Sequence, residues 1–192
     1  DIGTNGEIVL GNKDRLLFEL EVGMHLFEDF GKLGVAASAG YTNFNGDAEL
    51  GGDGAEQTDQ NVPRTSFNVV PFRATAYYRF DYTWTEWGIP LVPVVKGGFD
   101  YYWWEAEDGN GKTAEYDGQK GTGFRPGWHV SASLHLLLNI IDQRSAANFD
   151  LNWGINRTYL FGEYMLTRID GFGSPGLNLS DSQWLVGLSF EF

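Results

Sequence analysis

The chain has 192 residues, the size of one domain, and its 26 acidic against 13 basic residues give a formal net charge of −13 at pH 7. This acidic balance excludes a basic nucleic-acid-binding face, and the lack of cysteine excludes disulfides, thiolate metal sites and a cysteine nucleophile. Aromatic residues make up 16% of the chain and glycine contributes 26 residues, a pairing typical of short strands, tight turns and aromatic belts. We treat residues 1–192 as a single domain.

The start of the chain, DIGTNGEIVLG, lacks the basic beginning and apolar core of a secretory signal peptide. The most apolar run, residues 134–141, is broken by His135 and Asn139. It therefore falls short of the about 18 consecutive apolar residues that a membrane helix needs. A membrane strand needs only about 9–11 residues of alternating character. The sequence thus excludes a membrane helix and leaves a membrane β-barrel open.

Seven segments alternate apolar and polar side chains with the period of two that is typical of strands. In the first segment the apolar residues from Leu16 to Leu26 share one face, while Glu19 and Glu21 lie on the other. The later segments repeat this contrast between an uncharged apolar face and a face that carries charge. The predicted strands span residues 15–27, 32–42, 64–82, 89–104, 127–141, 157–169 and 182–192.

The position of the charges separates two all-β architectures. In a soluble sandwich the apolar faces pack together, whereas in a small membrane barrel they face lipid and the charged faces pack inside. Charge on nearly every polar face favours an antiparallel transmembrane β-barrel, and an unpaired charge inside it costs on the order of several kcal/mol. We therefore expect a paired lumen network of Glu19, Glu21, Lys32, Arg73, Arg79, Lys96, Asp100, Glu163 and Glu191.

Loop lengths alternate along the predicted strand order. The connections at residues 28–31 and 83–88 are short, whereas residues 43–63 and 105–123 are long, glycine-rich and acidic. Short turns at one end and long extracellular loops at the other are typical of an outer-membrane barrel. This rhythm predicts that the long acidic loops face the cell exterior.

The connection at residues 142–154 falls on the short-turn side and begins with Asp142, which is placed as a helix N-cap. We expect a short helical turn over residues 142–150 that lies across the barrel mouth.

Seven strands do not match the even number that closes a bacterial outer-membrane barrel, in which the amino terminus begins in the periplasm. Two arrangements give eight strands. A first strand lies upstream of Asp1, or residues 6–11 pair as a short strand of their own.

Aromatic residues gather near the predicted strand ends, as an interfacial girdle requires. Ordinary core aromatics are the alternative, because aromatic residues favour any strand. The predicted girdle contains Tyr82, Trp84, Trp87, Tyr101, Tyr102, Trp103, Trp104, Trp128 and Trp184.

The chain ends LVGLSFEF, with Gly187, Phe190 and a terminal Phe192. This ending resembles the carboxyl-terminal signal by which the assembly machinery recognises bacterial outer-membrane proteins, although Leu185 stands where that signal usually has a polar residue. The resemblance implies a bacterial outer-membrane location and contact with the barrel assembly machinery.

The chain as a whole is similar to a family of small outer-membrane β-barrel proteins of myxobacteria and related Gram-negative bacteria. The similarity is carried by residues 14–27, 35–44, 142–150 and 155–164. It implies a barrel fold in contact with outer-membrane lipid and lipopolysaccharide. It implies no reaction and no catalytic residues.

The best catalytic candidates lie together on one predicted strand face: His129, Ser131, Ser133 and His135. With an acid such as Glu163 they suggest a Ser–His–acid hydrolase. Residues i and i+2 of a strand lie about 6–7 Å apart, so we expect the nucleophile and its base to come from different strands. Polar filling of a narrow interior is the favoured interpretation, because buried serines and histidines normally satisfy hydrogen bonds.

Acidic loop residues are the candidate metal ligands, because calcium prefers oxygen ligands in flexible loops. Asp108, Asn110 and Glu115 are the strongest of these, yet Lys112 falls where an EF-hand loop requires a ligand. A solvated acidic loop is the favoured interpretation, so we expect neither a metal nor a cofactor.

These observations predict a non-enzymatic outer-membrane barrel that serves as a structural and interaction component of the cell envelope, with loops that contact other envelope proteins. Two alternatives remain. One is a narrow channel for small solutes, although an eight-stranded barrel has an interior just wide enough for side chains. The other is a lipid-modifying hydrolase that uses the lumen-facing serines and histidines.

Overall fold

The computed structural model describes residues 16–47, 64–108, 111–116 and 119–192. Within these residues seven long strands form one sheet, and the short strands β5 (Glu115–Tyr116) and β6 (Gln119–Lys120) form a separate hairpin. The long strands are β1 (Leu17–Glu28), β2 (Lys32–Asp47), β3 (Arg64–Arg79), β4 (Leu91–Glu107), β7 (Thr122–Leu137), β8 (Arg157–Arg168) and β9 (Asp181–Glu191).

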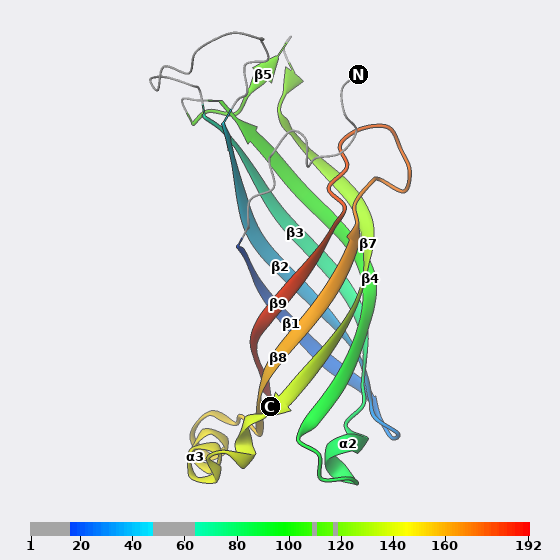
Figure 1. Ribbon diagram of the computed structural model, residues 1–192, viewed down its shortest axis with the longest axis vertical. Helices are drawn as coiled ribbons and strands as arrows, with labels where there is room; N and C mark the ends of the chain where they lie inside the picture. The colour runs from blue at the N-terminus through cyan, green and yellow to red at the C-terminus, as the bar shows by residue number, and fades with distance from the viewer. Residues whose placement is uncertain (1–15, 48–63, 109–110, 117–118) are drawn as a thin grey trace.

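The sheet is an antiparallel meander in the order β1-β2-β3-β4-β7-β8-β9, curled into a half-barrel (Figure 1). This confirms the predicted all-β class and the seven predicted strands. Each strand pairs antiparallel with the next, so the two edge strands, β1 and β9, run in the same direction. In Figure 1 the β5–β6 hairpin marks the upper end of the half-barrel, and the carboxyl terminus lies at the lower end.

The two faces of the sheet have the reverse of the burial expected in a soluble protein. Charged residues fill the inner face, where Arg73 and Asp100 are only 4% and 3% exposed. Large apolar residues cover the outer face, where Phe18 is 71% and Phe99 is 69% exposed. Soluble folds bury apolar side chains and leave charges in water. The period-two pattern therefore predicted the two faces correctly, and curvature has turned the charged one inward.

Glycines on the inner face leave room for aromatic rings on the neighbouring strand. In each of three cross-strand pairs, a Cβ added to the glycine would collide with the ring opposite it. A ring that covers a glycine in this way replaces the packing that the glycine lacks. The pairs are Gly34 with Tyr77, Gly123 with Trp104, and Gly187 with Phe161.

Small apolar clusters lie inside the half-barrel near both of its ends. The upper cluster is Phe67, Val69, Tyr102 and Ile169, and the lower cluster is Val92, Leu137 and Tyr159. Arg73 and Lys96 lie between them, whereas Arg79 and Glu191 lie beside Tyr159 of the lower cluster. The interior is thus charged along its middle, and charged and apolar side chains are mixed at its lower end.

The fifth predicted strand is displaced in the structure. The prediction was residues 127–141, whereas β7 begins at Thr122 and gives way to a 3-10 turn, η1 (Leu138–Ile140). The side chain of Asn139 explains this turn, because it donates to the carbonyl of Asn156 at 2.9 Å and accepts from the amide of Thr158 at 2.9 Å. These bonds tie the turn to the start of β8, where β7 ends.

The long loops are shorter than predicted. β2 continues to Asp47, β4 continues to Glu107, and the β5–β6 hairpin occupies part of the second loop. Pairing with neighbouring strands extends each strand beyond the point where its sequence stops alternating. A short helix, α2 (Tyr82–Thr85), forms the predicted tight connection at residues 83–88.

The helix predicted at residues 142–150 is present as α3 (Gln143–Trp153) and runs three residues further. Asp142 is its N-cap, and its carboxylate accepts from the amides of Arg144 at 3.1 Å and Ser145 at 3.0 Å. Gly154 ends the helix in the left-handed region at φ 69°. In the part of the chain that the structure describes, no helix is both long and apolar enough to cross a membrane.

The predicted position of this helix across the barrel mouth is wrong. α3 stands off the lower end of the half-barrel to one side (Figure 1), and none of its residues is buried. The helix places Ala146, Phe149 and Trp153 on one side, and Phe149 and Trp153 stay exposed there, so this side does not cover the opening.

Candidate functional site

The upper charged layer of the inner face is centred on Arg73 of β3. Its guanidinium pairs with Glu19 of β1, lies 3.5 Å from Asp100 of β4, and donates to the hydroxyl of Tyr102 at 2.7 Å. Glu19 also accepts from the hydroxyl of Ser38 at 2.6 Å. One buried cation therefore links β1, β3 and β4, which lie at different positions around the half-barrel.

The middle layer is centred on Lys96 of β4. Its ammonium lies 2.9 Å from Glu21 of β1 and 3.1 Å from Glu163 of β8. The two carboxylates come from strands near opposite edges of the sheet, so Lys96 bridges the interior from one side to the other. This contact fixes the curvature, because a flatter sheet would separate the three groups and leave buried Glu163 unpaired.

The lower layer joins the ends of four strands. Glu191, at the end of β9, pairs with Lys32 of β2, and it lies 3.5 Å from Arg79 of β3 and 3.7 Å from Arg157 of β8. Arg79 also donates to Asp81 at 2.6 Å. The last strand is thus held against β2 and β3 by side chains at the lower end.

The structure brings the nine predicted network residues together in these three layers. It adds four residues that the predicted network did not include: Ser38, Asp81, Tyr102 and Arg157. Asp81 continues the alternation of charged residues after Arg79, so this signal was present in the sequence. Tyr102 continues the same alternation after Asp100, but its place at a strand end favoured a girdle residue.

A hydrogen-bonded chain that begins at Asp100 of the upper layer runs inside the sheet toward the middle layer. Nδ1 of His129 donates to the carboxylate of Asp100 at 2.8 Å, and its Nε2 lies 3.2 Å from the hydroxyl of Thr75. The three residues come from β7, β4 and β3. An acid, an imidazole and a hydroxyl in this order are the groups of a nucleophilic triad.

Burial determines whether these three hydrogen-bonded residues can act on a substrate. Thr75, His129 and Asp100 all lie on the inner face and are all buried. A nucleophilic hydroxyl must meet its substrate directly. Thr75 is too deeply buried for that contact. The three residues therefore satisfy one another's hydrogen bonds inside the sheet.

The predicted hydrolase residues do not form a Ser–His–acid triad. His129 bonds to Asp100 and Thr75, and Glu163 pairs with Lys96. The hydroxyl of Ser131 makes no hydrogen bond within the described residues.

The expectation that a serine and a histidine two positions apart on a strand stay out of reach is wrong. The hydroxyl of Ser133 lies 3.1 Å from Nε2 of His135 on the same face of β7. Side chains lean along the strand, so their tips come closer than the spacing of their Cα atoms suggests. The ring of His135 also stacks on Phe161 at 5.2 Å.

The predicted metal-ligand residues are spread over the upper loop. The carboxylate of Asp108 accepts from the backbone amide of Lys112 at 3.0 Å, and Glu115 lies opposite Lys120 in the β5–β6 hairpin. Asn110 falls outside the described residues, as does most of the acidic loop at residues 43–63. Within the described residues, no group of three histidine, aspartate or glutamate side chains is arranged to hold a metal ion.

The predicted girdle is only partly on the outside. Tyr101 stacks on Phe124 at 4.9 Å near the upper end, and Tyr164 contacts Trp184 at 4.9 Å. Trp87 contacts the ring of Tyr82 at 5.8 Å near the lower end.

Three girdle assignments are wrong. Tyr102 points inward to Arg73, Trp104 packs against the upper apolar cluster, and Trp84 packs against the lower one. Tyr102 follows the inward parity of β4, and Trp84 lies in α2, where the period of two no longer applies.

The three residues of the carboxyl-terminal signal lie on β9 or directly after it. Gly187 faces inward beneath the ring of Phe161, whereas Phe190 and Phe192 are exposed on the outer side. The other edge of β9 pairs with no strand in the described part of the chain. A comparison with protein-family models finds no match for the chain, and a comparison with curated proteins finds none either.

Proposed function

We propose that the chain is a bacterial outer-membrane β-barrel that acts as a non-enzymatic structural and interaction component of the cell envelope. The observation that carries this proposal is the reversed burial of the sheet, with charges inside and large apolar side chains outside. Monomeric soluble proteins rarely expose apolar patches larger than a few hundred Å². An outer face that is apolar across all seven strands is suited to lipid.

The proposed barrel is closed by an eighth strand between β1 and β9. These two edges run in the same direction, so a strand of the opposite direction pairs antiparallel with both. A location in the bilayer requires this closure, because unpaired backbone N–H and C=O groups of an open strand edge are too costly in the hydrocarbon layer. The chain that precedes β1 supplies the strand, either upstream of Asp1 or at residues 6–11, which lie outside the described residues.

The inner face of β1 supports the same closure. Glu21 and Gly23 point inward yet are exposed, whereas inward residues of central strands, such as Ser131 and Glu163, are buried. The interior is therefore open along the β1 edge in the seven-stranded sheet. A strand placed there covers these residues and completes the lumen.

The loops and α3 supply the interaction surfaces in this proposal. The lower end carries the tight turns and the carboxyl terminus, so it faces the periplasm, as in other outer-membrane barrels. α3 projects from this end and exposes Phe149, Leu151 and Trp153. Exposed aromatic and aliphatic residues are common anchors of protein interfaces.

A structural role fits the interior better than transport does. Apolar clusters lie near both ends of the lumen, and the charges between them pair with one another. A hydrated solute would have to break these pairs and displace the clusters. Conductance in planar bilayers tests the channel alternative directly, and we expect none above the level of the bilayer alone.

Heat modifiability tests the closed membrane barrel. The protein is refolded into detergent and compared on gels with and without boiling, alongside circular dichroism. We expect a β spectrum and a boiling-dependent shift in migration, because a closed barrel resists detergent until it is heated. Unchanged migration together with solubility in plain buffer would show that the apolar faces meet each other, which overturns the proposal.

Site-specific photo-cross-linking tests the interaction role. A photoreactive residue replaces Trp153 of α3 in cells, and a matched variant carries it in place of Trp184 on the outer face of β9. We expect protein adducts from position 153 and only lipid adducts from position 184. Absence of protein adducts at position 153 argues against α3 as an interaction surface.

A further inference from the structure

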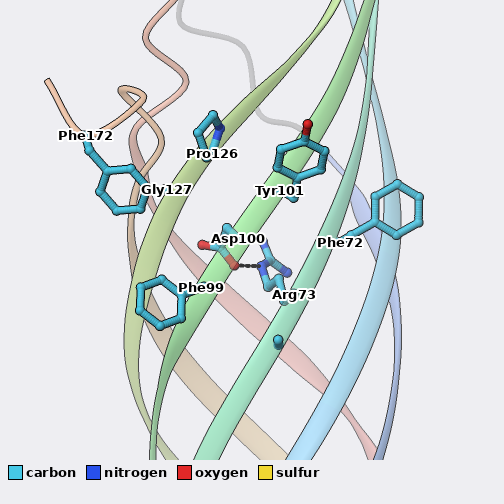
Figure 2. Close-up of a pocket in the computed structure, with 9 residues that line it drawn as sticks. Phe72, Arg73, Phe99, Asp100, Tyr101, Pro126, Gly127 and Phe172 are labelled. Atoms are coloured by element: carbon cyan, nitrogen blue, oxygen red, sulfur yellow. Dashed lines mark ion pairs between the residues drawn. The ribbon is translucent and has the colours of Figure 1, made fainter. Parts of the chain in front are cut away.

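A groove runs across the outer face of β3, β4 and β7 near the upper end. Its lower border is formed by the cross-strand pair Ala74 and Phe99 and by Gly127. Trp128 of β7 and Arg168 of β8 continue the cross-strand row of Ala74 and Phe99 beyond the groove. The upper border of the groove is formed by Phe72, Tyr101 and Pro126, which are neighbours on the same three strands. The groove has a volume of about 420 Å³. Figure 2 shows the rings of Phe72, Phe99 and Tyr101 around it.

Phe172, in the loop between β8 and β9, completes this outer groove. It is 60% exposed, and it has a left-handed backbone at φ 57°, which is uncommon for a residue other than glycine. Figure 2 shows its ring beside Gly127 at the edge of the groove. A residue held in a sparsely populated conformation signals a functional constraint when the surrounding structure enforces it.

Arg125 enforces the conformation of the Phe172 loop. Its guanidinium donates to three backbone carbonyls of the loop, those of Asp170 at 2.7 Å, Ser174 at 2.5 Å and Pro175 at 3.3 Å. The backbone amide of Gly171 also donates to the carbonyl of Pro126 at 3.0 Å. The loop is therefore tied to β7, and the apolar ring of Phe172 is presented at a fixed place on the outer face.

A cation lies beyond the lower border of the groove, at the end of the cross-strand row of Ala74 and Phe99. Arg168 is the last residue of β8, and its side chain is 63% exposed on the outer face beside Trp128. It donates from Nε to Asp170 at 2.9 Å, which uses one of the five donors of a guanidinium. The fork of an arginine is well suited to a phosphate group.

We propose that the outer groove binds one acyl chain of a phosphate-bearing lipid, with Phe172 against the chain and Arg168 at the phosphate. This inference rests on the proposed function, because the groove meets lipid only if the outer face lies in a bilayer. The apolar lining selects a hydrocarbon chain, and the cation beside it selects an anionic headgroup. The groove and Arg168 both lie near the upper end of the half-barrel, which places the headgroup at the bilayer surface on the loop side.

Photolabelling in vesicles tests the proposal. The full-length protein is inserted into phosphatidylcholine vesicles that contain a trace of phosphatidic acid with a diazirine in its acyl chain. After irradiation, labelled peptides are identified by mass spectrometry. We expect labelling of the peptides that contain Phe99, Tyr101 and Phe172 to exceed that of the β9 peptide with Trp184 by about tenfold.

Two variants distinguish the contact with the acyl chain from the contact with the headgroup. Phe172→Ala should reduce groove labelling by phosphatidic acid and by a diazirine diacylglycerol alike. Arg168→Gln should reduce labelling by phosphatidic acid about tenfold, the loss of one charge-assisted contact, and leave diacylglycerol labelling unchanged. Phe18→Ala, the same truncation on the outer face of β1, is the control that should leave groove labelling unchanged.

The outcomes distinguish this inference from the proposed function. Uniform labelling over the outer face of an inserted, heat-modifiable barrel overturns the lipid site and leaves the barrel intact. A groove protected by a second copy, seen as an intermolecular cross-link, overturns it as well. Failure of the protein to enter vesicles overturns the proposed function itself.

Discussion

The two faces of the sheet are built from the same alternating strands, but one face is buried and the other is exposed. The inner face buries Arg73, Asp100 and Glu163 in paired contacts, whereas the outer face exposes large apolar residues such as Phe99 and Val130. Alternation only assigns residues to faces, and the direction of curvature decides which face becomes the interior. The difference shows that the charge pairs, rather than a central apolar core, specify how this sheet is rolled.

The centre and the edge of the sheet differ in a related way. Inward residues of β7 are buried against neighbours on both sides, while β1 is exposed along most of both faces. The strand at the edge has the same alternation as the strand at the centre. Its exposure therefore reflects the lack of a second neighbouring strand among the described residues rather than a different sequence, and this difference is the basis for the proposed eighth strand.

Loss of Arg73 should be the largest disruption of the inner face. Arg73→Ala leaves Glu19 and Asp100 buried without their shared cation. We expect the free energy of unfolding to fall by about 3–5 kcal/mol, as measured by urea unfolding of the refolded protein in detergent. Lys120→Ala, a change at an exposed loop cation, should stay within about 0.5 kcal/mol. Equal effects for the two variants would show that the inner charges are not mutually dependent.

A charge on the outer face should be the next largest disruption, provided that this face meets lipid. Val130→Arg places a guanidinium on the outer side of β7, at a position that is already 45% exposed. We expect a loss of about 2–4 kcal/mol in phosphatidylcholine vesicles, the cost of arginine near the middle of a bilayer. A change near zero in vesicles would mean that water covers this face.

A methyl group on a crowded strand should have a smaller effect. The Cβ of Gly98→Ala would collide with the backbone carbonyl of Ala74, which cannot move independently of β3. We expect a loss of about 1–3 kcal/mol in the same unfolding experiment. Gly162→Ala is the matched control, because a Cβ there meets nothing within 4 Å. Equal stability of the two variants would contradict the close approach of β3 and β4.

The smallest expected effect lies outside the sheet, at the N-cap of α3. Hydrogen bonds from the side chain and backbone of Ser145 lower the pKa of Asp142. The stabilisation that these bonds give is present above the ordinary aspartate pKa and is lost as the pH falls through the lowered folded pKa. We expect α3 to fray on acidification over that range, as measured from the amide chemical shifts of Ala146 and Ala147.

Asp142→Asn is the control for this titration. Asparagine is as good an N-cap as aspartate and does not ionise. The variant should keep α3 folded and remove its dependence on pH in the acidic range. A titration that persists in the variant would assign it to another group.

The sequence by itself determined the number of long strands, their approximate limits and the face on which each residue lies. These features are local, because they depend on a period of two that each segment shows alone. The N-cap at Asp142 is local in the same sense, since its bonds reach only to Ser145. Such features were predicted correctly.

The tertiary structure alone decided which groups meet. Three sets of contacts each join different strands: the chain from Asp100 through His129 to Thr75, the bridge of Lys96 between Glu21 and Glu163, and the bond from Arg73 to Tyr102. Strand register and curvature set these distances, and neither is encoded in the alternation of one segment. The position of α3 beside the lower end has the same origin, because it depends on where β7 stops and β8 begins.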